Sequence, residues 1–330
     1  MSAAMQADHI FQLLDVEKVY RIDRGGWNRL RREPPRRLAA LDGVRLTVQP
    51  GDSIALVGES GSGKSTLLRV LLGLTPASDG RALYRGEEID ALAGDRRRTF
   101  QRDVAMVYQD ARASLNPRLK ALDLIAEPLR QHALCPPGEI RDRVIALLTR
   151  VGMPADTVDR YPSQLSGGQV RRVAIARALA SEPKVIVADE AVSGLDVSTQ
   201  AQLLNLLRGL QREMGLTLLF ITHDLAVASY LCRRIAVMYL GRIVETGPTK
   251  DVLRRPLHPY TRALLNASPR FFAPIAETLA GEIPSPIDLP PGCRFASRCP
   301  RAAADCRAQE PPLASQSTGR EAACLHPLAD

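Results

Sequence analysis

Apolar residues recur along the chain with two periods, one near two residues and one near 3.6. The stretches HIFQLLDVEKVYRI and LDGVRLTVQPGDSIALVGES alternate or run apolar, which predicts strands, with Pro50 and Gly51 joining two of them. TLLRVLLGL follows with helical spacing. The pattern therefore predicts a strand, a glycine-rich loop and a helix in direct succession.

The same periods predict the elements of the middle of the chain. DVAMVYQD reads as a strand, and IRDRVIALLTRVG and SGGQVRRVAIARALA read as helices. KVIVADE and GLTLLFITHD are short β-branched or apolar runs, and STQAQLLNLLRGLQREM between them is typical of a crossover helix. This alternation predicts an α/β fold with a parallel sheet covered on both faces.

Composition changes after Pro248, where proline recurs in LRRPLHPY and GEIPSPIDLPPG and four cysteines follow. We interpret the chain as one main domain over residues 1–250 and a separate tail over 251–330. The 330 residues are enough for such a core with an appendage.

Charge and hydropathy limit the classes of protein to which this chain can belong. Lysine and arginine number 44 against 36 acidic residues, a net charge of +8 that suits an anionic ligand or membrane face without demonstrating nucleic-acid binding. No run approaches the length of a membrane helix, and the first residues lack the basic start of a secretory signal. We therefore expect a chain that does not cross a bilayer by itself and that resides in the cytoplasm.

An arginine-rich insertion over residues 21–37 surrounds Trp27, and Pro34 and Pro35 preclude a helix there. Two interpretations stand: a solvated loop, or a contact with lipid headgroups or an acidic partner.

GESGSGKST, from Gly58 to Thr66, fits the phosphate-loop pattern G-x-x-x-x-G-K-[ST]. Backbone N–H groups wrap the phosphates of ATP, Lys64 reaches the outer phosphates, and the Ser65 hydroxyl binds Mg²⁺. Tyr20 is a candidate to stack on adenine. The candidate ATP-binding residues are Tyr20, Gly58, Ser60, Gly61, Gly63, Lys64, Ser65 and Thr66.

Four further polar residues follow three predicted strands. VIVADE ends in Asp189 and Glu190, which we assign to the metal's shell and to the attacking water, respectively. His223 follows the next strand and is expected to donate to the γ-phosphate. Gln109 follows VAMVY and is expected to contact the metal or the water. Magnesium would thus be held by Ser65, Gln109 and Asp189.

LSGGQVRR is a second glycine turn that opens a helix, although one phosphate loop already serves one ATP. Ser166 can cap the helix and donate to phosphate, Gly167 and Gly168 allow close backbone approach, and Gln169 follows them. An ordinary helix cap accounts for Ser166 but not for two glycines inside a helix.

These motifs occur in an order that resembles an ABC-type ATPase over roughly residues 10–250. The resemblance implies a P-loop NTPase with a RecA-like parallel sheet core, an antiparallel β subdomain and a helical subdomain over about 110–180. It also implies that the LSGGQ turn of one subunit caps the ATP held by another, with Asp196 of SGLD at the seam. ATP then closes the dimer, and hydrolysis assisted by Glu190 and His223 opens it.

Finer stretches, among them YQDARASLNPR, YLGRIVETGPT and HPYTRALLNASP, resemble the dipeptide, oligopeptide and nickel import branch, in its second ATPase type. The resemblance implies a second, different ATPase subunit, two membrane permease subunits, an extracytoplasmic binding protein and a place on the cytoplasmic face of the inner membrane. It also implies that the segment from Asp110 to about Arg130 docks the permeases. DAR after Gln109 and Gly194 depart slightly from the pattern.

The tail cysteines are Cys293, Cys299, Cys306 and Cys324. Some members of the peptide-importer branch bind an iron–sulfur cluster through such a tail, and four thiolates are the number required. The spacing lacks the C-x-x-C of zinc sites. A [4Fe–4S] cluster, zinc and unligated thiols stay open as alternatives.

Two rival functions stay open. A soluble ABC ATPase acting on nucleic acid or ribosomes would suit the basic charge, but the chain has no long heptad arms and no second nucleotide domain. Nickel or another small solute could replace peptides as the cargo.

Overall fold

The computed structural model describes residues 9–22, 36–267, 281–287 and 289–328. Within them the chain forms two compact units, one comprising 1–49, 54–91 and 222–330, the other 50–53 and 92–221. Trp27 and most of the predicted arginine-rich insertion lie outside the described residues. In the described part of the chain, no helix combines the length and hydropathy needed to cross a bilayer.

The first unit contains an antiparallel sheet with the strand order β2-β1-β4-β5. Its strands are β1 (Phe11–Ile22), β2 (Arg36–Val48), β4 (Asp79–Tyr84) and β5 (Glu87–Glu88). The buried residues of β1 and β2 form the core of this sheet, as the alternating pattern predicted. The predicted antiparallel β subdomain is confirmed.

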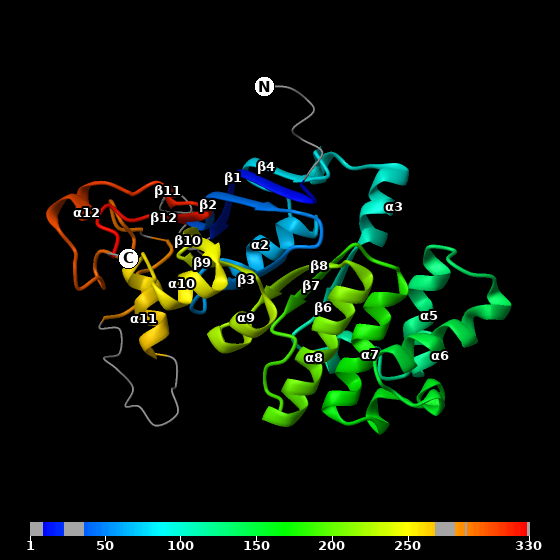
Figure 1. The fold of residues 1–330 in the computed structure, drawn as a ribbon. Helices are drawn as coiled ribbons and strands as arrows, with labels where there is room; N and C mark the ends of the chain where they lie inside the picture. Colours follow the sequence, from blue (N-terminus) through cyan, green and yellow to red (C-terminus); the bar gives the residue numbers. More distant parts are fainter. Residues whose placement is uncertain (1–8, 23–35, 268–280, 288, 329–330) are drawn as a thin grey trace, which may run out of the picture. The chain divides into compact units, whose positions relative to one another are not determined.

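The remaining strands of the first unit lie in the order β11-β12-β10-β9-β3 (Figure 1). They are β3 (Ser53–Val57), β9 (Arg234–Tyr239), β10 (Arg242–Pro248), β11 (Ala314–Ser317) and β12 (Arg320–Ala322). β3 pairs in parallel with β9, and the other pairs are antiparallel. The unit also contains α2 (Lys64–Leu71), η2 (Ile89–Ala91), α9 (Leu225–Leu231), α10 (Thr249–Arg254), α11 (Pro259–Ala267) and α12 (Ala304–Ala308).

The tail joins this unit through strand pairing. β12 continues the sheet beside β10, with Glu245 opposite Ala322 and Thr246 opposite Glu321. Composition led us to expect a separate tail, and no strand was identified within it because it shows no alternating run. The domain boundary near residue 250 stays a prediction.

The second unit contains three parallel strands in the order β8-β7-β6. They are β6 (Val104–Val107), β7 (Val185–Asp189) and β8 (Thr217–Ile221), and β8 is buried throughout. Continuous apolar strands of this kind are typical of a sheet covered on both faces. The predicted parallel strands are confirmed.

Helices make up the rest of the second unit. They are α3 (Gly94–Asp103), α4 (Ala111–Ser114), α5 (Ala121–Gln131), α6 (Ile140–Arg150), α7 (Gly167–Ala180) and α8 (Val197–Met214), with short 3₁₀ turns η3 (Pro137–Glu139), η4 (Ala155–Asp159) and η5 (Pro162–Gln164). α5, α6 and α7 pack against one another, and α7 also contacts β6 (Figure 1). α7 therefore links the other two helices of this group, α5 and α6, to the parallel strands.

Candidate functional site

The phosphate loop lies between β3 and α2 in the first unit. α2 begins at Lys64, the N-cap residue Gly63 before it provides no side-chain cap, and no acidic residue stands in its first turn. The first N–H groups of a helix have no partner within the helix, and they carry partial positive charge. The loop therefore ends in a helix start suited to an anion.

Gly63 shows why the loop needs glycine. Its φ is 104°, and a Cβ there would stand 2.5 Å from the carbonyl oxygen of Ala40. A backbone atom cannot move aside as a side chain can. The sequence of the loop is thus dictated by its packing inside its own chain as well as by its ligand.

Lys64 is buried at the centre of the loop. Its ammonium donates to the carbonyl oxygens of Gly58 (2.7 Å) and Glu59 (2.8 Å) and to the Ser62 hydroxyl (3.2 Å). These bonds hold one positive charge in the middle of the loop, while Ser60, Gly61 and Ser65 are exposed around it.

Two other predicted ATP contacts belong to the first unit. Tyr20 lies on β1, half-buried, with the Lys18 ammonium 5.3 Å from its ring centre. His223 is exposed directly before α9. The neighbouring Asp224 caps α9, because its carboxylate accepts from the N–H groups of Ala226 (2.8 Å) and Val227 (3.2 Å).

The predicted metal and water residues Gln109, Asp189 and Glu190 belong to the second unit. β7 ends at Asp189, and Glu190 follows with a φ of 43°. The Gln109 side-chain amide donates to a Glu190 carboxylate oxygen at 3.0 Å. The structure therefore brings together Gln109 and Glu190, which were selected from the ends of two different strands.

Glu190 is fixed through its backbone as well. Its N–H donates to the carbonyl of Ile221 (2.9 Å), and its carbonyl accepts from the N–H (3.0 Å) and hydroxyl (2.9 Å) of Ser193. A non-glycine residue in the left-handed region is strained, and such strain persists only where surrounding bonds enforce it. Those bonds place the carboxylate beyond the end of β7.

The LSGGQ turn opens α7 with a capping box. The Ser166 hydroxyl accepts from the Gln169 N–H (3.3 Å), and the Gln169 side-chain oxygen accepts from the Ser166 N–H (2.9 Å). Ser166 and Gly167 are exposed. The prediction that Ser166 caps this helix is confirmed.

The two glycines of the turn differ in their surroundings. A Cβ at Gly168 would stand 2.7 Å from the Thr199 methyl group on α8, whereas a Cβ at Gly167 would meet no atom within 4 Å. Packing within the chain thus explains glycine at 168 only. Arg171 and Arg172, which follow the turn on α7, donate to the carbonyls of Ser193 and Val151, respectively, at 2.5 Å each.

Asp196 caps α8. Its carboxylate accepts from the Thr199 N–H at 2.9 Å, and this hydrogen bond holds the pKa of Asp196 below its usual value. Val197 beside it is 83% exposed, which is unusual for a β-branched apolar residue.

The four tail cysteines, none of them in a disulfide, line one pocket in the first unit together with His258, Phe295 and His326. The pKa of the Cys293 thiol is raised to about 11, mainly by burial and to a smaller degree by the nearby Cys324, Cys306 and Cys299. Four thiols separated by up to 31 positions in the chain thus converge, and they fit the ligand count of a [4Fe–4S] cluster. Cys306 also lies within reach of Asp305 and His326 as an alternative set of metal ligands.

One participant was missed by the sequence analysis. Glu59, at a variable position of the phosphate-loop pattern, pairs with Arg298 of the tail at 2.8 and 3.1 Å. The two residues stand 239 positions apart, and no local pattern indicates that they pair.

The chain matches two family profiles. Residues 41–193 match the profile described as ABC transporter, and residues 244–306 match the profile described as oligopeptide/dipeptide transporter, C-terminal region. Together they include every predicted ATP-site and seam residue except Tyr20, Asp196 and His223, and three of the four cysteines.

Curated relatives match over most of their length. The oligopeptide transport ATP-binding proteins OppF of Salmonella typhimurium and Escherichia coli are 46% and 47% identical over 299 residues, 89% of this chain and of each relative. The dipeptide transport ATP-binding protein DppF of Haemophilus influenzae is 40% identical over 320 residues, 96% of both chains.

Solved structures show the same fold. A post-hydrolysis dimer of the ATP-binding cassette MJ0796, bound to ADP and Pi, matches with a TM-score of 0.62 at 30% identity, over 72% of this chain and 98% of that one. CbiO1 from Clostridium perfringens, part of an ABC transporter complex, matches with a TM-score of 0.64 at 29% identity, over 75% and 91%. The chain belongs to the ABC transporter family, as an ATPase of the branch that contains the oligopeptide and dipeptide transport ATP-binding proteins.

Proposed function

We propose that this chain binds and hydrolyses ATP to power an importer of di- and oligopeptides. The observation that carries the proposal is the match to oligopeptide transport ATP-binding proteins at 46–47% identity over 89% of both chains. The match of residues 244–306 to the transporter C-terminal profile supports the same cargo, because it lies outside the general ATPase motifs.

The roles of the site residues follow from their chemistry. Gly58, Ser60, Gly61, Gly63, Lys64, Ser65 and Thr66 hold the phosphates, Tyr20 stacks on adenine, and Ser65, Gln109 and Asp189 hold Mg²⁺. Glu190 accepts the proton of the attacking water, and Gln109, bonded to Glu190 at 3.0 Å, orients that carboxylate. His223 donates to the γ-phosphate.

Ser166, Gly167, Gly168 and Gln169 act on the ATP of a second subunit. The exposure of Ser166 and Gly167 and the open space at Gly167 support this role, since none of the residues that the structure describes covers them. Asp196 and the exposed Val197 would lie at the same seam. ATP binding then closes the dimer, because ATP has a higher affinity for the closed state, and hydrolysis releases it.

The partners are a second ATPase subunit in a heterodimer, two membrane permeases and an extracytoplasmic binding protein, with this chain on the cytoplasmic face of the inner membrane. Between α4 and α5, Asn116, Pro117, Arg118 and Leu119 are all exposed. An exposed leucine beside a rigid proline supports this loop as the centre of the permease dock.

A second proposal concerns the tail. Cys293, Cys299, Cys306 and Cys324 would hold a [4Fe–4S] cluster, which can supply one-electron redox chemistry or a rigid cross-link between the segments that bear its ligands. Their convergence in one pocket supports it. The alternative is a zinc ion held by Cys306, His326 and Asp305, whose ligand atoms lie within 4.8 Å of one another.

The test of function is co-expression of the chain with the genes beside it, followed by purification through a tag on this chain. We expect integral membrane subunits to co-purify, and uptake of labelled tripeptides into proteoliposomes to require ATP and Glu190. Uptake of nickel and not of peptides would show that nickel is the cargo and that the peptide assignment is wrong. Binding to nucleic acid or ribosomes without any membrane partner would support the rival class.

The test of the cluster uses anaerobically purified protein. We expect bound iron and an absorbance band at about 400 nm, both lost in Cys299→Ala and kept in Cys232→Ala, which changes a buried cysteine outside the tail. Zinc in place of iron, or no metal, would contradict the cluster.

A further inference from the structure

The seven residues from Cys293 to Cys299, here called the brace segment, connect the cysteine pocket to the phosphate loop. Cys293 and Cys299 at its ends line the pocket, whereas the side chains of Arg294 and Arg298 between them are each 5% exposed. Burying two charges within one short segment is costly unless each has close partners. Arg298 pairs with Glu59 of the phosphate loop, and Arg294 has its partners around a turn that contacts the loop.

Arg298 holds the phosphate loop directly. Its two terminal nitrogens donate to the two carboxylate oxygens of Glu59 at 2.8 and 3.1 Å, a bidentate geometry that fixes orientation as well as distance. The Glu59 side chain is 26% exposed, so the pair is only partly hydrated. One end of the loop is therefore attached to the tail.

Glu59 is held from other sides too. Its N–H donates to the Tyr260 hydroxyl at 2.9 Å, and its carbonyl accepts from the Lys64 ammonium at 2.8 Å. The residue that Arg298 grips is thus bonded to the lysine predicted to bind the outer phosphates of ATP. A shift of Glu59 would move an acceptor of that lysine.

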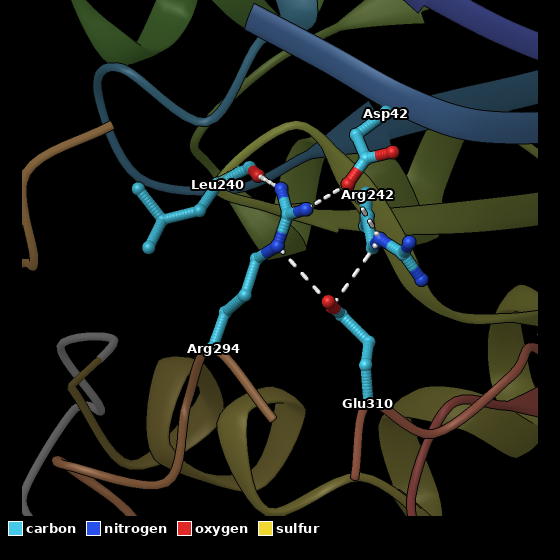
Figure 2. A network of polar contacts seen from close by, with 5 residues as sticks. All are labelled: Asp42, Leu240, Arg242, Arg294 and Glu310. Carbon is cyan, nitrogen blue, oxygen red and sulfur yellow. Dashed lines mark hydrogen bonds and ion pairs between the residues drawn. The ribbon is translucent and has the colours of Figure 1, made fainter. Parts of the chain in front are cut away.

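Arg294 reaches the other end of the loop through an adjacent turn. It donates to the Leu240 carbonyl and to the Asp42 carboxylate, and Glu310 lies 3.2 Å both from its Nε and from the Arg242 Nε (Figure 2). Two arginines and two carboxylates therefore balance one another around the turn between β9 and β10.

That turn contacts the phosphate loop. The N–H of Gly241 donates to the Ser62 carbonyl at 2.9 Å, and its carbonyl accepts from the Asp42 N–H at 3.0 Å. Gly241 also lies against Gly63, where a Cβ would stand 3.3 Å from the Gly241 Cα. The second arginine thus acts on the loop beside Lys64.

Phe295 anchors the brace segment between the two arginines. It is 1% exposed, and its ring packs 5.4 Å from the ring centres of both Tyr239 and Tyr260. Such an aromatic cluster has few alternative packings. The segment is therefore seated at one fixed depth, which sets where both guanidinium groups lie.

We propose that the brace segment positions the phosphate loop for ATP, with Arg298 and Arg294 as positioning residues, and that the cysteines at its two ends tie nucleotide affinity to the state of the cysteine pocket. The arginines act in every state of the pocket. A cluster bound by Cys293 and Cys299 together with Cys306 and Cys324 would fix both ends of the brace segment. It would thereby reduce the entropy lost when ATP orders the phosphate loop. This second part rests on the metal site proposed above.

The first test is the affinity of the isolated chain for a non-hydrolysable ATP analogue with Mg²⁺, measured by calorimetry. We expect Arg298→Ala to weaken binding by about tenfold, a modest share of what the loss of a buried charge pair costs. In ATPase assays KM should rise while kcat changes little, because positioning of the loop acts on bound substrate and transition state alike. Arg307→Ala, an exposed arginine beside Cys306, is the matched control and should bind as wild type.

A second variant separates positioning from folding. Arg298→Met with Glu59→Gln replaces the ion pair by groups of similar size, which restores stability where an unpaired charge would not. We expect thermal stability near that of wild type and affinity still reduced about tenfold. Affinity within twofold of wild type in either folded variant would overturn the positioning role. No membrane partner or peptide enters these tests, so their outcome is independent of the proposed transport function.

The link to the cysteines is tested by affinity before and after anaerobic reconstitution with iron and sulfide. We expect the reconstituted wild type to bind the analogue severalfold more tightly than the unreconstituted protein, with no such gain in Cys299→Ser. The gain should also vanish in Arg298→Ala, because the pair transmits it. Equal affinities before and after reconstitution, in protein shown by its absorbance to hold the cluster, would overturn the link.

Discussion

Two glycine turns that open helices, the phosphate loop before α2 and the LSGGQ turn before α7, differ in what surrounds them. The loop is packed against its own chain, with Gly63 against Ala40 and Glu59 paired with Arg298. The LSGGQ turn satisfies its helix start with a capping box and leaves Ser166 and Gly167 exposed. The phosphate loop is therefore fixed by contacts with its own chain. The LSGGQ turn has its polar groups satisfied by its own capping box, yet its surface is exposed. A turn of the second kind suits a ligand carried by another molecule.

The largest expected effect is on ATP hydrolysis, the reaction in which we propose that both turns take part. Glu190→Gln keeps the size of the side chain and its bond to Gln109 while removing the base, so we expect turnover to fall by about 100- to 10,000-fold. ATP-driven association, measured by size exclusion with ATP and Mg²⁺, should persist. Glu182→Gln is the control, since Glu182 is another acid of the second unit with a positive φ of 53°. Wild-type turnover in Glu190→Gln would remove Glu190 as the base.

The packed turn is broken by Gly63→Ala. The new Cβ would meet the Ala40 carbonyl in a left-handed backbone, so we expect a loss of about 1–3 kcal/mol in the free energy of unfolding and a loss of ATP binding. Thermal unfolding with and without ATP measures both. Gly61→Ala is the control, because Gly61 has a φ of 79° but open space around it. Equal destabilisation by the two would mean that backbone angle and not packing dictates glycine in this loop.

The open turn is tested by Gly167→Asp. An acid in the first turn of α7 should stabilise the isolated chain by about 0.3–1 kcal/mol. The same charge would face the partner's triphosphate, and we expect ATP-driven association to weaken by at least about tenfold, since like charges at an interface are costly. Gly138→Asp, at another exposed glycine with open space, should leave association unchanged. Normal association in Gly167→Asp would mean that the LSGGQ turn only caps α7 and does not face the partner's ATP.

The strands and helices that were predicted correctly are those whose pattern is local. β3, β7 and β8 are short apolar runs with clear ends, and the helices α2, α6, α7 and α8 carry helical spacing within the segments that form them. Chain order then placed Gln109 and Glu190 at neighbouring strand ends, because carboxyl ends of parallel strands meet at one edge. The structure joins their side chains by a hydrogen bond, whereas the prediction for Gln109 was a contact with the metal or the water.

The features that escaped prediction depend on distant partners. β12 is three residues long and forms because β10 offers an edge, so no alternating run announces it. Arg294 and Arg298 look in sequence like any solvated arginines, and only the folded chain shows Glu59, Asp42 and Glu310 around them. The open space at Gly167 and the Thr199 methyl group against Gly168 are likewise invisible in a motif that reads simply as GG.

The smallest expected effect divides the two glycines of the open turn. Gly168→Ala gains helix propensity, but its Cβ would stand 2.7 Å from the Thr199 methyl group, and overpacking costs more than propensity returns. We expect a net loss of about 1 kcal/mol in the free energy of unfolding, measured by denaturant titration. Thr199→Ser removes that methyl group and keeps the hydroxyl, so the double variant should regain the loss. If Gly168→Ala alone stabilises the chain, Gly168 does not owe its identity to α8 and becomes, like Gly167, a position that only a partner's ligand explains.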